Sequence, residues 1–275
     1  MTPAPTIELL DGRAIPRLGL GTWPLDDDEA YAAVGTALEH GYRLIDSAAR
    51  YDNEVGVGRA VADSGVPRDE IVVTTKLPGA DHGYEEALAG FEDSRRRLGL
   101  EHVDLFLIHW PLPTVDRYVD TWRAFVELRE RGLARSIGVS NFTPEQIERI
   151  VAATGVWPAV NQIELHPDFS QPDVRAWHAE HGVAIESWRP LGRGLLGHPK
   201  LVAIGEAHGK TPAQVVLRWH VQLGLVAIPK SGNAERIAQN IEIFDFELSD
   251  DELAVLAELD RDNRLGGVPE SHVEL

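Results

Sequence analysis

The chain lacks cysteine altogether, contains a single methionine and has far fewer basic than acidic residues. Without cysteine there is neither a disulfide framework nor thiolate chemistry. The 26 Lys and Arg residues against 44 Asp and Glu give a formal net charge of -18, which repels nucleic acid and anionic membrane surfaces. We therefore expect no nucleic-acid or membrane partner, and any anionic ligand must find a local cationic site.

Long hydrophobic runs and targeting signals are missing as well. No apolar run approaches the roughly 18 residues of a membrane span, and residues 1–16 have neither the basic nor the apolar region of a secretory signal. These absences predict a cytoplasmic protein. No linker, low-complexity tract or charge block divides the chain, so residues 1–275 are predicted to form a single domain.

What the chain does contain is a regular alternation of short apolar runs and amphipathic stretches. Residues 6–16 form two short alternating segments around Asp11-Gly12, a dipeptide that favours a β-hairpin. Eight apolar runs follow, at residues 17–23, 42–46, 71–76, 103–110, 134–141, 159–165, 183–188 and 225–231. The stretches between them have helical periodicity and stop at glycine. Eight such alternations predict an α/β fold, a (β/α)8 TIM barrel with an N-terminal β-hairpin.

In such a barrel the residues at the carboxyl ends of the strands line the active-site mouth. The residues that end the eight runs are Trp23, Asp46, Lys76, His109 with Trp110, Ser140 with Asn141, Gln162 with Glu164, Trp188, and Lys230 with Ser231. Tyr51 follows shortly after the second run. Only one histidine stands at a strand end, so no metal site is predicted.

Four of these residues can form a proton-transfer unit. A tyrosine titrates near ~10, but an ammonium at about 4 Å lowers its pKa by roughly three units before desolvation is counted. Lys76 is expected to supply this shift to Tyr51, while Asp46 holds the ammonium and His109 donates a second hydrogen bond to the substrate oxygen. A structural ion pair of Asp46 with Lys76, beside an ordinary barrel histidine, explains the spacing equally well.

Three long segments resemble the signatures of the aldo-keto reductase family, in the family's order. They are "GYRLIDSAARYDNEVGVG" (41–58), "ELRERGLARSIGVSNF" (127–142) and "IPKSGNAERIAQN" (228–240). The resemblance implies an NADPH-dependent carbonyl reductase with a catalytic tetrad of Asp46, Tyr51, Lys76 and His109, in which Tyr51 is the general acid. Within the family, "VAATGVWPAVNQIELHP" (151–167) and "HGKTPAQVVLRWH" (208–220) are most similar to bacterial 2,5-diketo-D-gluconate reductases.

The strand ends also offer groups that suit a nicotinamide cofactor. Ser140, Asn141 and Gln162 are predicted to hold the carboxamide, and Trp188 to stack on the nicotinamide ring, with ordinary core packing as the alternative for the indole. In the "PLGRG" segment the glycines let the backbone approach the pyrophosphate. The predicted pyrophosphate contacts are Leu191, Gly192 and Gly194.

After the last apolar run, Lys230, Ser231 and Arg236 concentrate cationic and hydroxyl donors in an otherwise acidic chain. They are predicted to hold a 2'-phosphate by charge-assisted hydrogen bonds, which favours NADPH over NADH. A solvated helix start, with both cations facing water, is the alternative. Gln239 and Asn240 match the adenine-side positions of the family that the chain resembles.

The predicted substrate pocket is aromatic, lined by Trp23, Tyr51, His109 and Trp110. Segments after residues 109 and 260 that are shorter than in steroid-binding members of the family that the chain resembles indicate an open pocket for small aldehydes, ketoacids or keto sugars. The resemblance implies dicarbonyls or keto sugars such as diketogluconate among the substrates. Three tail residues face either a substrate carboxylate or solvent: Arg261, Arg264 and His272.

Other functions remain compatible with parts of the pattern. A non-enzymatic NADPH-binding sensor of the same fold would keep the cofactor residues and is the alternative function. A Schiff-base aldolase is disfavoured because no lysine ends the sixth or seventh run. The protein is expected to be a monomer.

Overall fold

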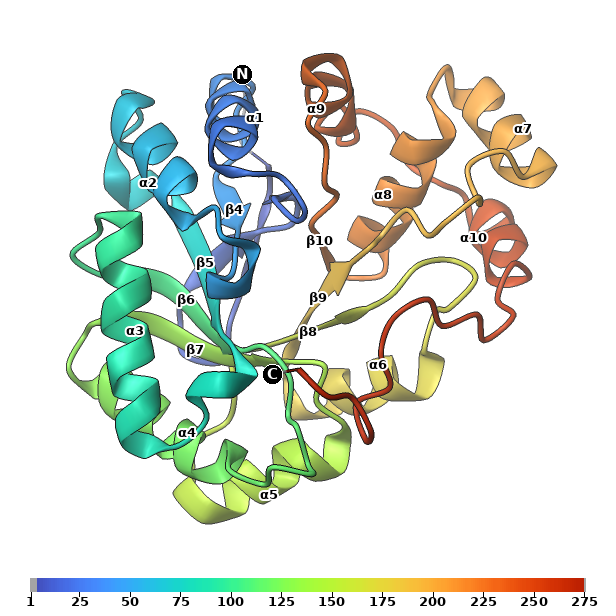
Figure 1. Ribbon diagram of the computed structural model, residues 1–275. Coiled ribbons are helices and arrows are strands. Elements are labelled where there is room, and N and C mark those ends of the chain that lie inside the picture. The colour runs from blue at the N-terminus through green and yellow to red at the C-terminus, as the bar shows by residue number, and fades with distance from the viewer. Residues whose placement is uncertain (1–3, 275) are drawn as a thin grey trace.

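The computed structural model describes residues 4–274 and contains a ring of parallel strands surrounded by helices (Figure 1). The barrel strands are β3 (Leu20–Gly21), β4 (Leu44–Asp46), β5 (Val72–Leu77), β6 (Val103–Ile108), β7 (Ala134–Ser140), β8 (Val160–Glu164), β9 (Ala184–Trp188) and β10 (Val226–Ala227). Each coincides with one of the eight apolar runs. Strands that follow one another in the sequence are neighbours in the sheet, from β3 to β10.

Backbone bridges between the first and last strands close this sheet. Leu18 pairs with Ala227, and Gly21 pairs with Lys230, both in parallel register. Glycine is required at this seam because a Cβ on Gly21 would lie 2.9 Å from the carbonyl oxygen of Ile228. The predicted (β/α)8 barrel is confirmed.

The predicted N-terminal hairpin is also confirmed. Strands β1 (Thr6–Glu8) and β2 (Ala14–Pro16) pair antiparallel across a turn in which Gly12 has a φ of 79°. Leu9 and Ile15 of the hairpin are buried. They belong to one apolar cluster with the strand residues Leu44, Leu105, Leu107, Val160 and Val226. The hairpin therefore packs against the interior of the barrel.

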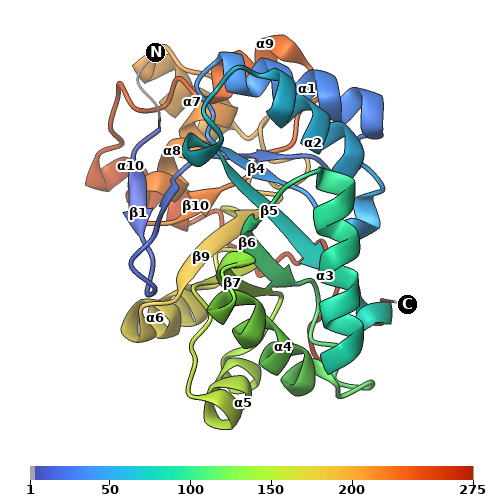
Figure 2. The same cartoon turned by 90° about the vertical axis from the view of Figure 1, so that its left-hand side faces the viewer.

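Helices cover the outside of the ring, as the perpendicular view in Figure 2 shows. They are α1 (Asp27–Glu39), α2 (Glu54–Asp63), α3 (Tyr84–Leu98), α4 (Tyr118–Glu130), α5 (Pro144–Thr154), α6 (Pro172–His181), α7 (Pro199–His208), α8 (Pro212–Gln222), α9 (Ala234–Asn240) and α10 (Asp250–Ala257). Their starts follow local chemistry: Asp26 and Glu29 form a capping box at α1, and Thr143 and Gln146 form another at α5. Within residues 4–274 no helix combines the length and apolarity needed to cross a membrane.

A continuous apolar layer joins the strands to these helices. Phe106 of β6 stacks on Phe125 of α4 at a centroid distance of 4.3 Å and meets the edge of Phe91 of α3 at 5.0 Å. All three rings are fully buried. This layer fixes the strands and so the positions of their carboxyl ends. The assignment of the whole chain to one domain stays a prediction.

Two neighbouring helices approach each other closely at glycine. A Cβ on Gly58 of α2 would lie 2.1 Å from the carbonyl oxygen of Leu98 at the end of α3, whereas a Cβ on Gly35 of α1 would meet no atom within 4 Å. We expect Gly58→Ala to lower the free energy of unfolding by ~1–3 kcal/mol through overpacking. The matched control, Gly35→Ala, is expected to raise it by ~0.5–1 kcal/mol through helix propensity. Urea unfolding followed by circular dichroism measures both, and equal effects of the two substitutions would contradict the close approach.

Candidate active site

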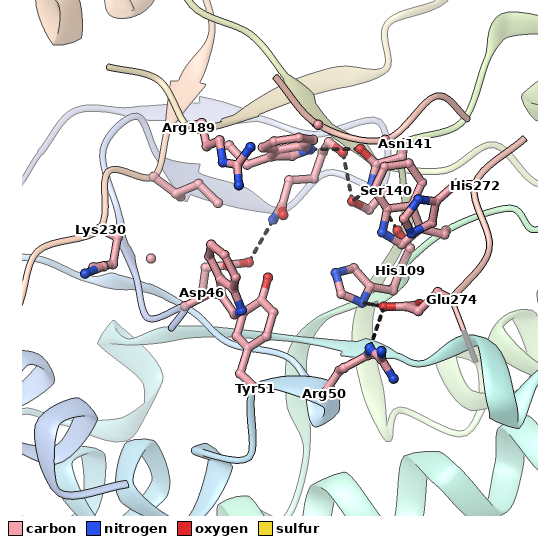
Figure 3. Close-up of a pocket in the computed structure, with 18 residues that line it drawn as sticks. Asp46, Arg50, Tyr51, His109, Ser140, Asn141, Arg189, Lys230, His272 and Glu274 are labelled. Carbon is pink, nitrogen blue, oxygen red and sulfur yellow. Dashed lines mark hydrogen bonds and ion pairs between the residues drawn. The ribbon is translucent and has the colours of Figure 1, made fainter. Parts of the chain in front are cut away.

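A cavity of about 370 Å³ opens at the carboxyl ends of the barrel strands (Figure 3). Many of the residues predicted at strand ends line it, namely Trp23, Asp46, Tyr51, His109, Trp110, Ser140, Asn141, Gln162, Trp188 and Lys230. Strand register explains the convergence, because Asp46 pairs with Gly21 on β3 and with Thr74 on β5. Neighbouring strands therefore end at one rim, as expected for this fold.

Lys76 lies beneath the cavity and contacts two of the residues that line it, Asp46 and Tyr51. Its side chain has no exposed surface, and that of Asp46 is 3% exposed. Lys76 Nζ lies 2.7 and 2.8 Å from the two carboxylate oxygens of Asp46 and 2.8 Å from the carbonyl oxygen of Ser47. It also donates to the hydroxyl of Tyr51 at 3.3 Å, which the short helix Ala49–Tyr51 brings to the cavity. The predicted grouping of Asp46, Tyr51 and Lys76 is thus present in space.

The expected lowering of the Tyr51 pKa is not found. Burial raises the pKa of Tyr51, and although Lys76 lowers it, Asp46 raises it again, so the net pKa is above its usual value. Burial also acts against the ammonium of Lys76, but attraction by Asp46 and Tyr51 raises the net pKa of Lys76. The sequence argument was wrong because desolvation of the phenol outweighs an ammonium whose charge is already largely matched by Asp46. Tyr51 is therefore protonated at neutral pH.

His109 lies beside Tyr51 at the cavity wall. The two rings meet edge to face at a centroid distance of 5.8 Å, and the His109 side chain is 13% exposed. Its Nδ1 lies 2.8 Å from a carboxylate oxygen of Glu274, which comes from the C-terminal tail. With Nδ1 held in this way, Nε2 is the ring nitrogen that remains to meet a ligand.

A second buried acid lies next to Asp46. Gln162 Nε2 donates to Asp46 Oδ1 at 2.7 Å and to Glu186 Oε2 at 3.1 Å, so one amide connects the two carboxyl groups. Glu186 on β9 has no exposed surface, and its Oε1 has no hydrogen-bond partner among the described residues. Burial, reinforced by the charge of Asp46, raises the pKa of Glu186 to about 8. Glu186 is therefore mostly protonated at neutral pH.

The amide and indole groups predicted to meet a nicotinamide form their own network. Asn141 Nδ2 donates to the carbonyl oxygen of His109 and to Ser140 Oγ, both at 3.0 Å. Asn141 Oδ1 accepts from Trp188 Nε1 at 2.8 Å. Ser140 Oγ donates to the carbonyl oxygen of Gln162 at 2.9 Å. The predicted residues lie together on one wall, and the indole is only partly buried.

The predicted phosphate-binding residues follow β10 along the rim. Lys230 lines the cavity, on the opposite side from His109 in Figure 3. Ser231 is buried and exchanges hydrogen bonds with the backbone of Asn233, the N-cap of α9. Of the other predicted cofactor residues, Arg236, Gln239 and Gly194 are exposed, Leu191 and Gly192 are partly buried, and Asn240 is buried. The donors expected for a 2'-phosphate follow the last strand, with Lys230 at the cavity, Ser231 bonded to the N-cap of α9 and Arg236 within α9.

Comparison with known proteins agrees with this geometry. The family model described as "Aldo/keto reductase family" matches residues 17–261. The chain belongs to the aldo/keto reductase family.

Similar aldo-keto reductases include proteins named for different carbonyl substrates. "2,5-diketo-D-gluconic acid reductase B" of Corynebacterium sp. is 49% identical over 277 residues and 100% of both chains. "Methylglyoxal reductase DkgA" of Escherichia coli is 46% identical over 96% of both chains. Among solved structures, a variant of Gox0644 in complex with NADPH superposes with a TM-score of 0.95 at 46% identity, over 99% of this chain and 100% of that chain.

In this aldo-keto reductase the C-terminal tail forms part of the site, one of the two alternatives that the sequence left open. Buried acids at and just after the end of β8 anchor the tail: Glu164 accepts from the backbone N–H groups of Leu265 and Gly266 at 2.7 and 2.8 Å. Asp168 accepts from the side chains of Arg261 and Asn263 at 3.1 and 2.9 Å. Between the two acids, His166 places Nε2 3.0 Å from Glu164 and Nδ1 2.5 Å from Asp168.

The anchored tail then covers the rim of the cavity. Gly266, Gly267, His272 and Glu274 line it, and His272 stacks on Trp110 at 3.7 Å. Of the three tail residues considered from the sequence, His272 alone reaches the cavity wall, because Arg261 is paired with Asp168 and the Arg264 guanidinium lies over the ring of Phe169 at 4.6 Å.

The sequence analysis did not assign Arg50, Glu186 or Glu274 to the site. Arg50 precedes Tyr51 and Glu186 interrupts an apolar strand, so both carried a local signal. Glu274 carried none, since its place depends on contacts with residues 79 and 109, far away in the sequence.

The buried Glu186 should make stability depend on pH. Between the pKa of an unfolded glutamate, ~4.3, and the folded value of about 8, the folded state holds a proton that the unfolded chain has lost. The free energy of unfolding from this group therefore falls as pH rises through that window and stops falling above it. We expect Glu186→Gln to remove this loss, so its stability relative to wild type should grow by ~1–3 kcal/mol between pH 5 and pH 8.

Urea unfolding at both pH values measures this difference. The control is Glu180→Gln, which makes the same change at an exposed position of α6. If Glu186→Gln and wild type differ in free energy of unfolding by the same amount at both pH values, Glu186 is ionised in the folded protein throughout this pH range.

Proposed function

We propose that this protein reduces carbonyl compounds to alcohols and that Tyr51 is the general acid. Membership of the aldo/keto reductase family makes the chain an NADP-dependent oxidoreductase that acts on carbonyl groups. The observation that carries the assignment of the acid is the 3.3 Å contact between the Tyr51 hydroxyl and the buried ammonium of Lys76 at a ligand-sized cavity. When bound, NADPH supplies a hydride from nicotinamide C4 to the carbonyl carbon.

The proton follows a short path in this proposal. Tyr51 is protonated before the reaction because burial raises its pKa, so it carries the proton that it donates. As the carbonyl oxygen gains negative charge, the Tyr51 O–H bond breaks and the proton moves to that oxygen. Lys76 stabilises the phenolate that remains, and Asp46 keeps Lys76 charged and oriented.

His109 is proposed as the second group that meets the carbonyl oxygen. It lies beside Tyr51 at the cavity wall, and its Nδ1 is already engaged by Glu274. Nε2 is then positioned to donate a hydrogen bond to the same oxygen. Together with Tyr51, Lys76 and Asp46 it completes the proposed catalytic tetrad.

The proposed cofactor contacts fit the chemistry of the amide, hydroxyl and indole groups at the cavity wall. Ser140, Asn141 and Gln162 offer hydroxyl and amide groups to the carboxamide, and Trp188 offers a ring face to the nicotinamide. Asn141 Oδ1 accepts a bond from the Trp188 indole and has a second lone pair with which to accept one from a carboxamide. Remaining proposed contacts, with the pyrophosphate and adenine, are Leu191, Gly192, Gly194, Gln239 and Asn240.

Lys230, Ser231 and Arg236 are proposed to bind the 2'-phosphate and so to favour NADPH over NADH. They carry cationic and hydroxyl donors at the rim of an otherwise acidic protein, as phosphate recognition requires. The solved relative in complex with NADPH supports the same cofactor here.

The proposed substrates are small aldehydes, dicarbonyls and keto sugars. Supporting this, the cavity of about 370 Å³ is lined by Trp23, Tyr51, His109 and Trp110, and similar proteins are named for diketogluconic acid and methylglyoxal. A monomeric state and a cytoplasmic location stay predictions.

The test of the acid is Tyr51→Phe. We expect kcat for carbonyl reduction to fall by about 10²–10⁴-fold, because proton donation is lost, while NADPH affinity stays within about threefold of wild type. NADPH oxidation by absorbance and NADPH binding by fluorescence measure the two effects. Tyr31→Phe is the control, since it removes a tyrosine hydroxyl that bonds Asp63 on the outer helices. Normal turnover by Tyr51→Phe would remove Tyr51 from the mechanism, and a wild type that binds NADPH but reduces no carbonyl would favour the sensor.

The cofactor assignment has a separate test. Lys230→Ala and Arg236→Ala are each expected to weaken NADPH binding by about 10-fold or more and NADH binding by less than about threefold, because only NADPH carries the 2'-phosphate. The control is Lys200→Ala, which removes an exposed lysine paired with Glu258 away from the cavity. Equal weakening of both cofactors would refute the 2'-phosphate assignment.

A further inference from the structure

The most unexpected feature of the cavity is an acid supplied by the last described residue of the chain. In Figure 3 Glu274 lies between His109 and Arg50, at the end of the cavity opposite Lys230. Figure 1 shows the tail returning from α10 across the mouth of the barrel to reach this point. The carboxylate therefore faces the place where a substrate meets Tyr51 and His109.

Three groups hold this carboxylate in place. His109 Nδ1 lies 2.8 Å from Glu274 Oε1, Arg50 Nε lies 3.4 Å from the same oxygen, and Gly79 N donates to Oε2 at 3.3 Å. The side chain of Glu274 is 5% exposed. Burial raises the pKa of Glu274, but the bond from His109, the charges of His109 and Arg50 and the Gly79 N–H lower it below its usual value. Glu274 is thus ionised at neutral pH.

The barrel is shaped to receive this part of the tail. A Cβ on Gly79 would lie 2.4 Å from the carbonyl oxygen of Glu274, so only glycine allows the tail backbone to approach so closely. Next to it, His272 stacks on Trp110, and Gly267 leaves room for both rings. Contacts of the Glu274 backbone with Gly79 and of His272 with Trp110 therefore position the carboxylate.

This placement determines the charge that a substrate meets at the catalytic end of the cavity. On that side of the cavity Glu274 is paired with both His109 and Arg50, and the ammonium of Lys76 is already paired with Asp46. The other lining cations lie across the cavity. Arg189 donates to the carbonyl oxygen of Leu265 and lies over two tryptophan rings, and Lys230 is proposed above to bind the cofactor.

We propose that Glu274 makes the cavity select uncharged carbonyl compounds over those that carry a carboxylate near the carbonyl. The inference rests on the proposed carbonyl reduction and narrows its substrate class. A substrate carboxylate would enter a cavity in which the matching position is already filled by a fixed carboxylate, and two like charges held close together repel each other. Small neutral aldehydes and dicarbonyls meet no such barrier, whereas a sugar acid such as diketogluconate does.

The experiment compares two aldehydes that differ in charge but not in the reacting group. Succinic semialdehyde carries a carboxylate, its methyl ester carries none, and in both two methylene groups insulate the aldehyde from the change. We expect wild type to show a kcat/KM at least about 10-fold higher for the ester. Glu274→Gln should reduce this preference by about 10-fold, while Glu274→Asp, which keeps the charge, should retain most of it. Because the readout is a ratio, a general loss of activity in a variant does not affect it.

The matched control is Glu270→Gln, which removes one carboxylate from an exposed position of the same tail and should change the ratio by less than about twofold. An unchanged ratio in Glu274→Gln overturns the proposal, and so does a wild type that reduces the acid as efficiently as the ester, a result that needs no variant. A wild type that reduces neither compound, nor any other carbonyl, overturns the proposed function and this inference with it.

Discussion

Lys76 carries an ammonium group into the interior of a barrel, where its side chain has no exposed surface. A charge in that position is tolerated only if it is paired and hydrogen-bonded, because desolvation costs several kcal/mol per ion. Both oxygens of Asp46 and the backbone of Ser47 meet this demand. Neighbouring strands β4 and β5 supply the two charges, so the pairing of these strands and the pairing of the ions depend on each other.

The same pair determines the protonation of its neighbours. Asp46 and Lys76 cancel each other, and a further charge in the same buried space would be unpaired. Tyr51 and Glu186 accordingly have raised pKa values and keep their protons at neutral pH. Two neutral acids thus flank the buried pair of Asp46 and Lys76, and Tyr51 is the one with its hydroxyl beside the ammonium. In the proposed mechanism Tyr51 becomes a phenolate when it gives up its proton. Lys76 then stabilises this anion as well as the carboxylate of Asp46.

Ion pairs between acidic side chains and a few basic ones also hold the C-terminal tail at the rim of the cavity. Glu164 and Asp168 flank His166 and bind the tail, and Glu274 at its end binds His109 and Arg50. In a chain with a formal charge of -18, positive groups are scarce, and those at the catalytic end of the cavity are already engaged by the protein's own carboxylate.

The sequence by itself determined the strands, the hairpin and the grouping of residues at the strand ends, because apolar periodicity and turn residues are local properties and the barrel converts them into positions. It also placed Asp46, Tyr51, Lys76 and His109 around one mouth. Only the tertiary structure decided the direction of the Tyr51 pKa, since that depends on burial by elements from the whole chain. The place of Glu274 was decided in the same way, because its bond to Gly79 joins residues 195 positions apart and no local pattern encodes such a contact.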